Sequence, residues 1–246
     1  METVRRFDDR AADYVKYRPT YPRHAIDAIL DGLGSPAGIV AADVGAGTGI
    51  SARLLGDAGV RVIAVEPGAA MRAAAADHPR VTWVAGTAEA TGLASNSIDL
   101  VLAAQAFHWF RPPEALAEFA RILKPGRRLA IMWNRRSTTD PLTAGYRQAI
   151  VDVGGEIEAE RMPFDPGVVA GSGLFTSAER VEFPNAQRLD LDGLIGRARS
   201  ASYVPKTGGD GAKLISMLKD LHARHADSNG YVSLVYVTEV YRARRL

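Results

Sequence analysis

A glycine-rich turn is the part of the sequence best suited to hold a ligand. Residues 43–49 read Asp-Val-Gly-Ala-Gly-Thr-Gly and directly follow the apolar run 38–42. Because glycine has no Cβ and adopts positive φ, the backbone can turn sharply out of a buried strand here and approach a bulky ligand. The turn predicts a nucleotide-cofactor site, and the residues that we expect at the ligand are Asp43, Gly45, Ala46, Gly47, Thr48 and Gly49.

A second acid extends this site. Residues 61–66 have the pattern of a buried strand that ends in Glu66, which follows Asp43 by 23 residues. Both acids would then stand at carboxyl ends of strands, where open α/β sheets bind ligands. An acid at this position can accept hydrogen bonds from both hydroxyls of a ribose.

Two alternatives to this interpretation stay open. The dinucleotide fingerprint requires G-x-G-x-x-G, whereas here the third glycine comes one residue early and Ile50 takes the sixth place. The chain also lacks a recognisable Tyr-x-x-x-Lys pair, which disfavours an NAD(P)-dependent oxidoreductase. The turn could otherwise be a tight strand-to-helix connection with no ligand.

Apolar runs and helical patterns alternate through the first half of the chain. Such alternation predicts an α/β fold with a mostly parallel, doubly wound sheet and helices on both faces. Strands are expected near 39–44, 61–66, 81–86, 98–104 and 128–134, and helices near 50–58, 68–77 and 113–123. The last helix is bounded by Pro112-Pro113 and by Lys124-Pro125-Gly126.

The remaining segments complete one domain, predicted to span residues 1–246. Residues 1–30 predict a helical flap with an apolar helix through Ile26, Ile29 and Leu30. The cofactor-binding core would span residues 36–134. In residues 135–175 the alternation of strand and helix patterns is weaker, which predicts a partly helical segment that covers the substrate. Residues 176–246 would supply strands and helices, with a short strand near 179–185 and another from Tyr231 to Tyr241.

The motifs together resemble class I S-adenosylmethionine-dependent methyltransferases. The family pattern h-h-D-x-G-x-G-x-G is matched by residues 41–49, the ribose acid by Glu66, and the adenine-contact loop by Gly86-Thr87-Ala88-Glu89. Residues 97–104 resemble the fourth strand, and 123–130 the turn into the fifth. The resemblance implies a Rossmann-like sheet of seven strands, whose last strand inserts antiparallel beside the fifth.

A narrower resemblance concerns the small-molecule branch of methyltransferase type 11, which includes trans-aconitate methyltransferase-like proteins. It rests on Phe7-Asp8 with Tyr14, on residues 18–22 and on residues 105–110. The resemblance implies further cofactor contacts from Tyr14, Arg18, Pro67, Met71, Thr87, Ala88, Glu89, Gln105 and Ala106. It implies acceptor contacts from Tyr21, Trp109 and Trp133.

Arg135 and Arg136 come just past the predicted fifth strand, at the rim where substrates of parallel sheets bind. Paired guanidinium hydrogen bonds there could hold a carboxylate or a phosphate of the acceptor. The alternative is that both arginines are solvated and open a loop. Their place in the sequence agrees with either interpretation.

His108 is the candidate catalytic residue. It lies just beyond the fourth strand among Phe107, Trp109 and Phe110, and an imidazole there could remove a proton from an oxygen or nitrogen nucleophile. Alternatively, it packs among the aromatic side chains with its nitrogens on backbone groups. Trp109 is expected to form a wall of the pocket or part of the core rather than to take part in the chemistry.

Composition narrows the classes of function. The chain has 246 residues with a formal net charge of +2 and no cysteine, which excludes disulfides, thiolate metal sites and a cysteine nucleophile. Arginines are spread along the sequence without an aromatic-interleaved basic block, so nucleic acid is not the expected substrate. Neither a signal peptide, a membrane span nor metal-ligand spacing is recognisable, and we expect a cytoplasmic monomer or homodimer without membrane partner or metal.

These observations lead to one functional hypothesis. The protein is expected to move a methyl group from S-adenosyl-L-methionine to a small organic acceptor, with S-adenosyl-L-homocysteine as the product. Methylation of oxygen, and of a carboxylate in particular, is favoured because an ionised carboxylate needs no base. The alternative from another class is a catalytically silent adenosylmethionine-binding or partner protein.

Overall fold

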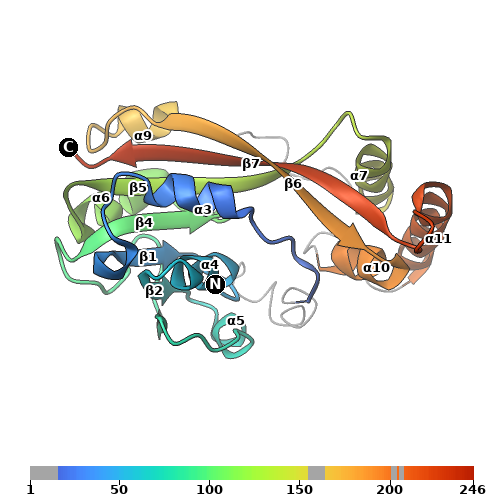
Figure 1. The fold of residues 1–246 in the computed structure, drawn as a ribbon, viewed down its shortest axis with the longest axis horizontal. Helices are drawn as coiled ribbons and strands as arrows, with labels where there is room; N and C mark the ends of the chain where they lie inside the picture. The colour runs from blue at the N-terminus through green and yellow to red at the C-terminus, as the bar shows by residue number, and fades with distance from the viewer. Residues whose placement is uncertain (1–15, 155–163, 201–203, 205–207) are drawn as a thin grey trace. The chain divides into compact units, whose positions relative to one another are not determined.

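The computed structural model describes residues 16–154, 164–200, 204 and 208–246 (Figure 1). The chain divides into two compact units. The core unit comprises Tyr21–Trp133, Phe164–Phe183 and Thr238–Leu246. The helical unit comprises Met1–Thr20, Asn134–Pro163 and Pro184–Val237.

Seven strands form one sheet in the order β3-β2-β1-β4-β5-β7-β6. Along β3-β2-β1-β4-β5 each strand is parallel to the next, whereas β5, β7 and β6 pair in the antiparallel direction. The expected fold class is therefore confirmed. The strands are β1 (Val40–Val44), β2 (Arg61–Val65), β3 (Val81–Val84), β4 (Ile98–Ala104), β5 (Leu123–Arg136), β6 (Glu179–Leu189) and β7 (Val232–Arg244).

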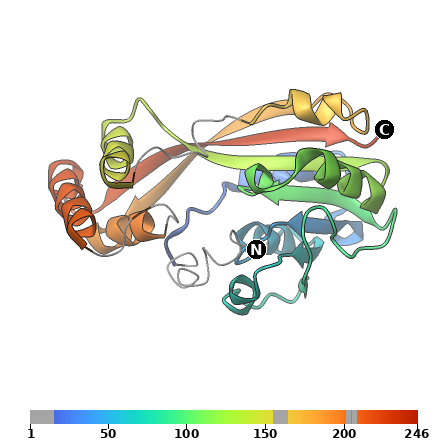
Figure 2. The same cartoon turned by 180° about the vertical axis from the view of Figure 1, so that it is seen from behind.

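Alternating residues of the strands bury two apolar faces in the core unit. Leu100 and Leu102 of β4 pack with α3 (Arg23–Leu30) and α4 (Ile50–Asp57), whereas Val101 and Ala103 pack with α6 (Pro112–Ile122). Figure 1 shows α3 and α4 in front of the sheet, and Figure 2 shows α6 in front of its other face. The period of two along the strands therefore produces the predicted double winding.

The helix α3 differs from the expected flap. Ala25, Ile26, Ile29 and Leu30 are buried, and they join the apolar cluster on one face of the sheet. The helix thus forms part of the core. Residues 1–15 of the expected flap lie outside the described residues.

The fifth strand begins earlier than the sequence pattern indicates. Lys124-Pro125-Gly126, expected to be a stop before a strand at 128, lies inside β5, which starts at Leu123. The pairing with β4 shifts register between Ile98 and Leu100, so the extra residues form a bulge. Gly126 adopts φ +72° there, a conformation that suits glycine in bulges.

Two further elements depart from their predicted lengths. The helix α5 covers only Ala69–Ala73 because it buries a single side chain, Met71, and so lacks an apolar face that would extend it. The strand β6 continues through Pro184 to Leu189 rather than ending near 185. Proline is compatible with this strand because β6 is the edge of the sheet.

The helical unit has its own apolar core. Its helices are α7 (Pro141–Gly154), α10 (Leu191–Arg199) and α11 (Gly208–His225), whereas the short α9 (Gly167–Gly171) belongs to the core unit. Tyr146, Leu194 and Leu218, one from each long helix, are fully buried in this cluster. The helices α7 and α9 lie within residues 135–175, and the role of this segment as a substrate cover stays a prediction.

Candidate active site

The glycine turn connects β1 to α4 and has the backbone geometry that its sequence indicates. Gly45, Gly47 and Gly49 adopt φ values of +70°, +57° and +76°. A Cβ built on Gly45 would lie 2.7 Å from the Cβ of Ala106, a contact closer than side chains tolerate. The absence of a side chain at Gly45 therefore lets the turn after β1 touch the segment after β4.

Glu66 is tied to this turn by backbone hydrogen bonds. Its Oε2 accepts from the N–H of Gly47 at 2.9 Å, and its Oε1 accepts from the N–H of Gly68 at 2.8 Å. Burial raises the pKa of Glu66, whereas these two amides and the charge of Arg72 act in the opposite direction. Each carboxylate oxygen keeps a second lone pair, so Glu66 can accept two further hydrogen bonds from a ligand.

Asp43 is completely buried at the end of β1. Its Oδ2 accepts a 2.7 Å hydrogen bond from Oγ of Ser51, and the backbone N–H of Ala52 in α4 also stabilises the carboxylate. Desolvation outweighs these bonds and raises the pKa of Asp43 to about 7. Asp43 therefore connects the end of β1 to the first turn of α4.

Two buried polar atoms in the turn have no hydrogen-bond partner among the described residues: Oδ1 of Asp43 and Oγ1 of Thr48. An unsatisfied buried polar atom is costly unless a ligand or water completes its bonds. A polar nucleoside cofactor fits this turn. It would bond to these two atoms and to the remaining lone pairs of Glu66, and Gly45 has no side chain in its way.

The loop after β3 carries Thr87, Ala88 and Glu89 and is held against α6. Glu89 accepts a 2.9 Å hydrogen bond at Oε1 from the N–H of Arg111, which directly precedes that helix. Burial would raise the pKa of Glu89, but the bond from Arg111 and other hydrogen bonds lower it overall. Ala88 is buried, whereas Thr87 is exposed.

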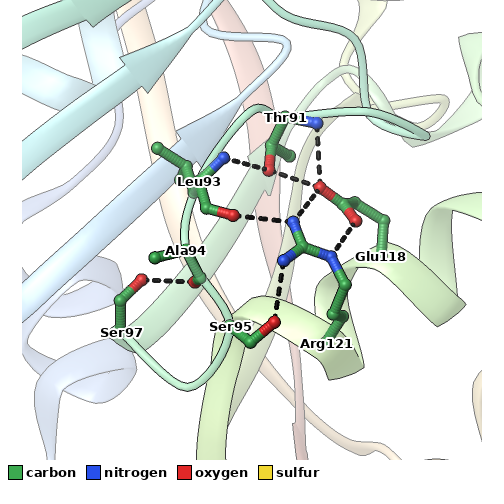
Figure 3. Close-up of polar contacts among 7 residues, drawn as sticks. All are labelled: Thr91, Leu93, Ala94, Ser95, Ser97, Glu118 and Arg121. Carbon is green, nitrogen blue, oxygen red and sulfur yellow. Dashed lines mark hydrogen bonds and ion pairs between the residues drawn. The ribbon is translucent and has the colours of Figure 1, made fainter.

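A buried carboxylate holds the far end of the same loop. Oε1 of Glu118 accepts hydrogen bonds from the N–H of Thr91 at 2.9 Å and from its Oγ1 at 2.6 Å (Figure 3). Arg121 donates to both carboxylate oxygens of Glu118 and also to the carbonyl of Leu93 (Figure 3). The loop is therefore positioned by α6 from both ends.

Pro67 and Met71 follow Glu66. Pro67 is exposed, and its carbonyl accepts a 2.9 Å hydrogen bond from Arg72. Met71 is 5% exposed and is the buried residue of α5. Both therefore stand next to the carboxylate that we expect at the ribose.

The segment after β4 brings the aromatic residues to the site. Gln105 has a φ of +54°, unusual for a residue with a side chain, and its N–H donates to the carbonyl of Met132 at 2.8 Å. Such strained backbone concentrates at functional sites. Ala106 is buried, and Phe107 begins a 3-10 helix, η2, that spans Phe107–Trp109.

His108 lies beside two tryptophans. Its ring centroid is 4.6 Å from that of Trp109 and 5.2 Å from that of Trp133. His108 is exposed, and Trp109 is 45% exposed, so neither belongs to the core. This exposure excludes the interpretation that Trp109 is part of the core. Its other predicted role, as a wall of the acceptor pocket, stays a prediction.

The other predicted acceptor residues have different surroundings. Tyr21 is buried with α3 in an apolar cluster of the core unit. Arg135 and Arg136 belong to the helical unit and are the last residues of β5 rather than the start of a loop. Arg135 is exposed, whereas the guanidinium of Arg136 lies 5.5 Å from the ring centroid of Tyr146.

The two remaining candidates precede α3. Arg18, in the helical unit, donates from Nη2 to the carbonyl of Ser200 at 3.2 Å. Tyr14 lies outside the described residues.

Sequence reasoning missed several groups that support the site. Ser51 could have been found, because it falls in the first turn of a helix that starts beside Asp43. The amide of Gly68 and the Glu118–Arg121 pair carried no recognisable signal, since their roles depend on tertiary contacts.

The described part of the chain shows neither a membrane-spanning helix nor a metal-binding cluster. None of its helices is both long and apolar enough to cross a membrane. No group of three or more histidine or carboxylate side chains in these residues is arranged to hold a metal ion.

Comparisons with known proteins agree with this geometry. The family model of a methyltransferase domain, type 11, matches residues 42–131. An uncharacterized methyltransferase of Mycobacterium tuberculosis is 34% identical, over 96% of this chain and 94% of the relative. Another of Schizosaccharomyces pombe is 32% identical, over 75% of this chain and 77% of the relative.

Solved structures show the same fold. A protein from Anaeromyxobacter dehalogenans, provisionally named a type II methyltransferase, has a TM-score of 0.67 at 26% identity, with 93% of this chain and 98% of that chain covered. The chain therefore belongs to the class I S-adenosylmethionine-dependent methyltransferases. The expected cofactor, S-adenosyl-L-methionine, is the methyl donor of this class.

Proposed function

We propose that the protein transfers the methyl group of S-adenosyl-L-methionine to a small organic acceptor. The observation that carries this proposal is the link between the glycine turn and Glu66, whose carboxylate is fixed by the amides of Gly47 and Gly68. A fixed carboxylate at the end of β2 is suited to accept hydrogen bonds from the two ribose hydroxyls of the donor. Asp43 and Thr48 would complete the polar contacts of the turn.

The loop after β3 would contact the adenine. Ala88 is buried and Glu89 is fixed by the amide of Arg111, so this loop is ordered before a ligand binds. Gln105 and Ala106 would approach the donor from the end of β4, since Ala106 already faces Gly45. Met71 would pack against the nucleoside from α5. These residue roles are part of the proposal.

Positioning is the main task of the site. A methyl group on a sulfonium is already electrophilic, so alignment of the acceptor atom and exclusion of water account for much of the rate. Trp109 and Trp133 are suited to form an apolar wall beside the methyl group, and His108 between them could take a proton from a hydroxyl or an amine. A carboxylate acceptor would not need this proton transfer.

The acceptor that we favour carries a carboxylate, which would be methylated on oxygen. Arg135 and Arg136 are the last two residues of β5. Their guanidinium groups would bind a second acidic group of the acceptor. The modest net charge of +2 and the dispersed arginines support a small molecule over a nucleic acid.

An acceptor screen tests the proposal. The purified protein would receive S-adenosylmethionine with a deuterated methyl group and a panel of small acids, their amides and esters, phenols and amines. Mass spectrometry would detect products that carry the labelled methyl group. We expect labelled methyl esters, and Arg135→Gln and Arg136→Gln should raise the KM for diacids more than for monoacids. Labelled amides at parental rates in both variants would contradict the carboxylate proposal.

Calorimetry separates the wider alternatives. Binding of S-adenosylhomocysteine without turnover of any acceptor class would support a catalytically silent binding protein. Tight binding of NAD without a response to S-adenosylhomocysteine would contradict the assignment of the site.

A further inference from the structure

A cleft in the core unit, distant from the glycine turn along the strands, is rich in arginine. It has a volume of about 260 Å³. Arg128 pairs with Leu100 near the start of β4, whereas the candidate active site is formed at the ends of β1 and β4. The cleft is lined by Asp31, Gly32, Arg128, Thr176, Ser177, Glu179, Arg242, Ala243 and Arg244.

Three guanidinium groups line this cleft and are only partly compensated by acids. Arg128 is 6% exposed, and its Nη1 donates to the carbonyls of Ile29 and Asp31 at 2.7 and 2.6 Å. No described residue offers Arg128 a carboxylate within hydrogen-bond distance. Burial lowers the pKa of Arg128, and the positive charges of Arg242 and Arg244 act in the same direction. Asp31 and Glu179, which also line the cleft, offset this effect only in part.

Arg242 and Arg244 come from the end of β7. Arg242 donates to the carbonyl of Ala28 at 2.9 Å and to the carboxylate of Glu179 at 2.7 Å, while its buried Nε has no partner among the described residues. The side chain of Arg244 is exposed and makes no hydrogen bond or ion pair with the described residues, whereas its backbone bonds to Thr176.

Part of this arrangement stabilises the fold. Arg128 and Arg242 both donate to carbonyls in the last turn of α3 or just after it, where cations are favourable. Arg244 makes no such bond, and the hydroxyls of Thr176 and Ser177 also line the cleft. Capping of α3 therefore does not account for the third guanidinium or for the cleft.

We propose that this cleft binds a phosphate group, either inorganic phosphate or the phosphate of a small phosphomonoester. Guanidinium groups bind phosphate oxygens through paired, charge-assisted hydrogen bonds. The hydroxyl of Ser177 would add a neutral donor, whereas the hydroxyl of Thr176 already donates to the carbonyl of Ser177 at 3.2 Å. A dianion would also relieve the repulsion among the three arginines. The site lies apart from the glycine turn and does not depend on the proposed methyl transfer.

Isothermal titration calorimetry on the full chain tests the proposal. Inorganic phosphate and glycerol 3-phosphate would be titrated separately, at constant ionic strength and with saturating S-adenosylhomocysteine. We expect saturable one-site binding of at least one of them. The change Arg244→Gln should weaken it about tenfold or more, because a charge-assisted pair is lost while the backbone bonds to Thr176 remain.

Arg61→Gln is the matched control. It removes the same charge from an exposed position of β2 that does not line the cleft, and binding should stay within about twofold of the parent. Tighter binding of the phosphomonoester would identify an organic ligand, and equal affinities would identify recognition of the phosphate group alone. The absence of saturable binding up to about 10 mM, or equal losses in both variants, would show that the arginines act only in the fold.

Discussion

The carboxylate of Glu66 accepts a hydrogen bond from the backbone N–H of Gly47, with 2.9 Å between Oε2 and the amide nitrogen. This bond joins the ends of β1 and β2 through the glycine turn. It orients the carboxylate before a ligand arrives, which lowers the conformational cost of binding. Because Oε1 is held by Gly68 in the same way, the whole carboxylate is fixed.

The first prediction follows from this bond. Glu66→Ala removes the acceptor for two amides and for the ribose hydroxyls, so S-adenosylhomocysteine should bind about 2–4 kcal/mol more weakly by calorimetry. Glu66→Gln keeps one acceptor oxygen and should lose less. Unchanged affinity in Glu66→Ala would disprove the ribose assignment.

The second prediction concerns Asp43 and pH. Its pKa of about 7 in the folded protein lies above the ordinary value near 3.9, so the folded state holds this proton where the unfolded state has lost it. Between about pH 4 and pH 7 the folded state therefore binds more protons, and this carboxyl group makes stability fall as the pH rises. Above pH 7 the contribution levels off, at a cost of a few kcal/mol.

Asp43→Asn isolates this contribution. Denaturant unfolding of the parent and of the variant would be compared from pH 4.5 to 8. The parent should lose stability relative to Asp43→Asn as the pH rises, because the amide does not ionise. Parallel curves across the range would show that Asp43 does not titrate in this window.

The third prediction compares two glycines with positive φ. Gly45 has φ +70° and Gly126 has φ +72°, but a Cβ on Gly45 would meet Ala106 at 2.7 Å, whereas one on Gly126 meets nothing within 4 Å. Both alanine variants should lose about 1 kcal/mol to backbone strain. Gly45→Ala should lose about 1–3 kcal/mol more and weaken S-adenosylhomocysteine binding.

Urea unfolding measures both losses. Gly126→Ala serves as the control for strain alone and should bind the ligand like the parent. Equal losses of stability in the two variants would mean that the close approach between Gly45 and Ala106 is unimportant.

The sequence predicted the sheet and the conformation of the glycine turn well because both depend on local patterns. The strand at 98–104 has its predicted bounds, and the turn from 43 to 49 with Glu66 follows from residue type and spacing. The bulge in β5 and the full length of the edge strand β6 escaped prediction. Gly126 and Pro184 resemble breaks in the sequence, yet pairing with neighbouring strands carries β5 and β6 through them.

The supporting contacts of the site were harder to predict. The bond from Ser51 to Asp43 needs only a helix start and could be inferred, but the contact of Glu118 with Thr91 joins residues 27 positions apart. The packing alternative for His108 rested on its aromatic neighbours, but the residue is exposed in spite of them. Exposure there depends on what covers η2, and a local pattern does not contain that information.

The last prediction uses that exposure to separate catalysis from packing at His108. An exposed side chain contributes little to stability, so His108→Ala should change the free energy of unfolding by no more than about 0.5 kcal/mol. S-adenosylhomocysteine should bind as in the parent. With a hydroxyl or amine acceptor, turnover should fall by about 10²–10⁴-fold, because the general base is lost. With a carboxylate acceptor, which is ionised already, the loss should be small.

His24→Ala, at another exposed histidine of the core unit, is the control and should leave turnover unchanged. A large loss of stability in His108→Ala would instead favour a packing role for this ring beside Trp109 and Trp133.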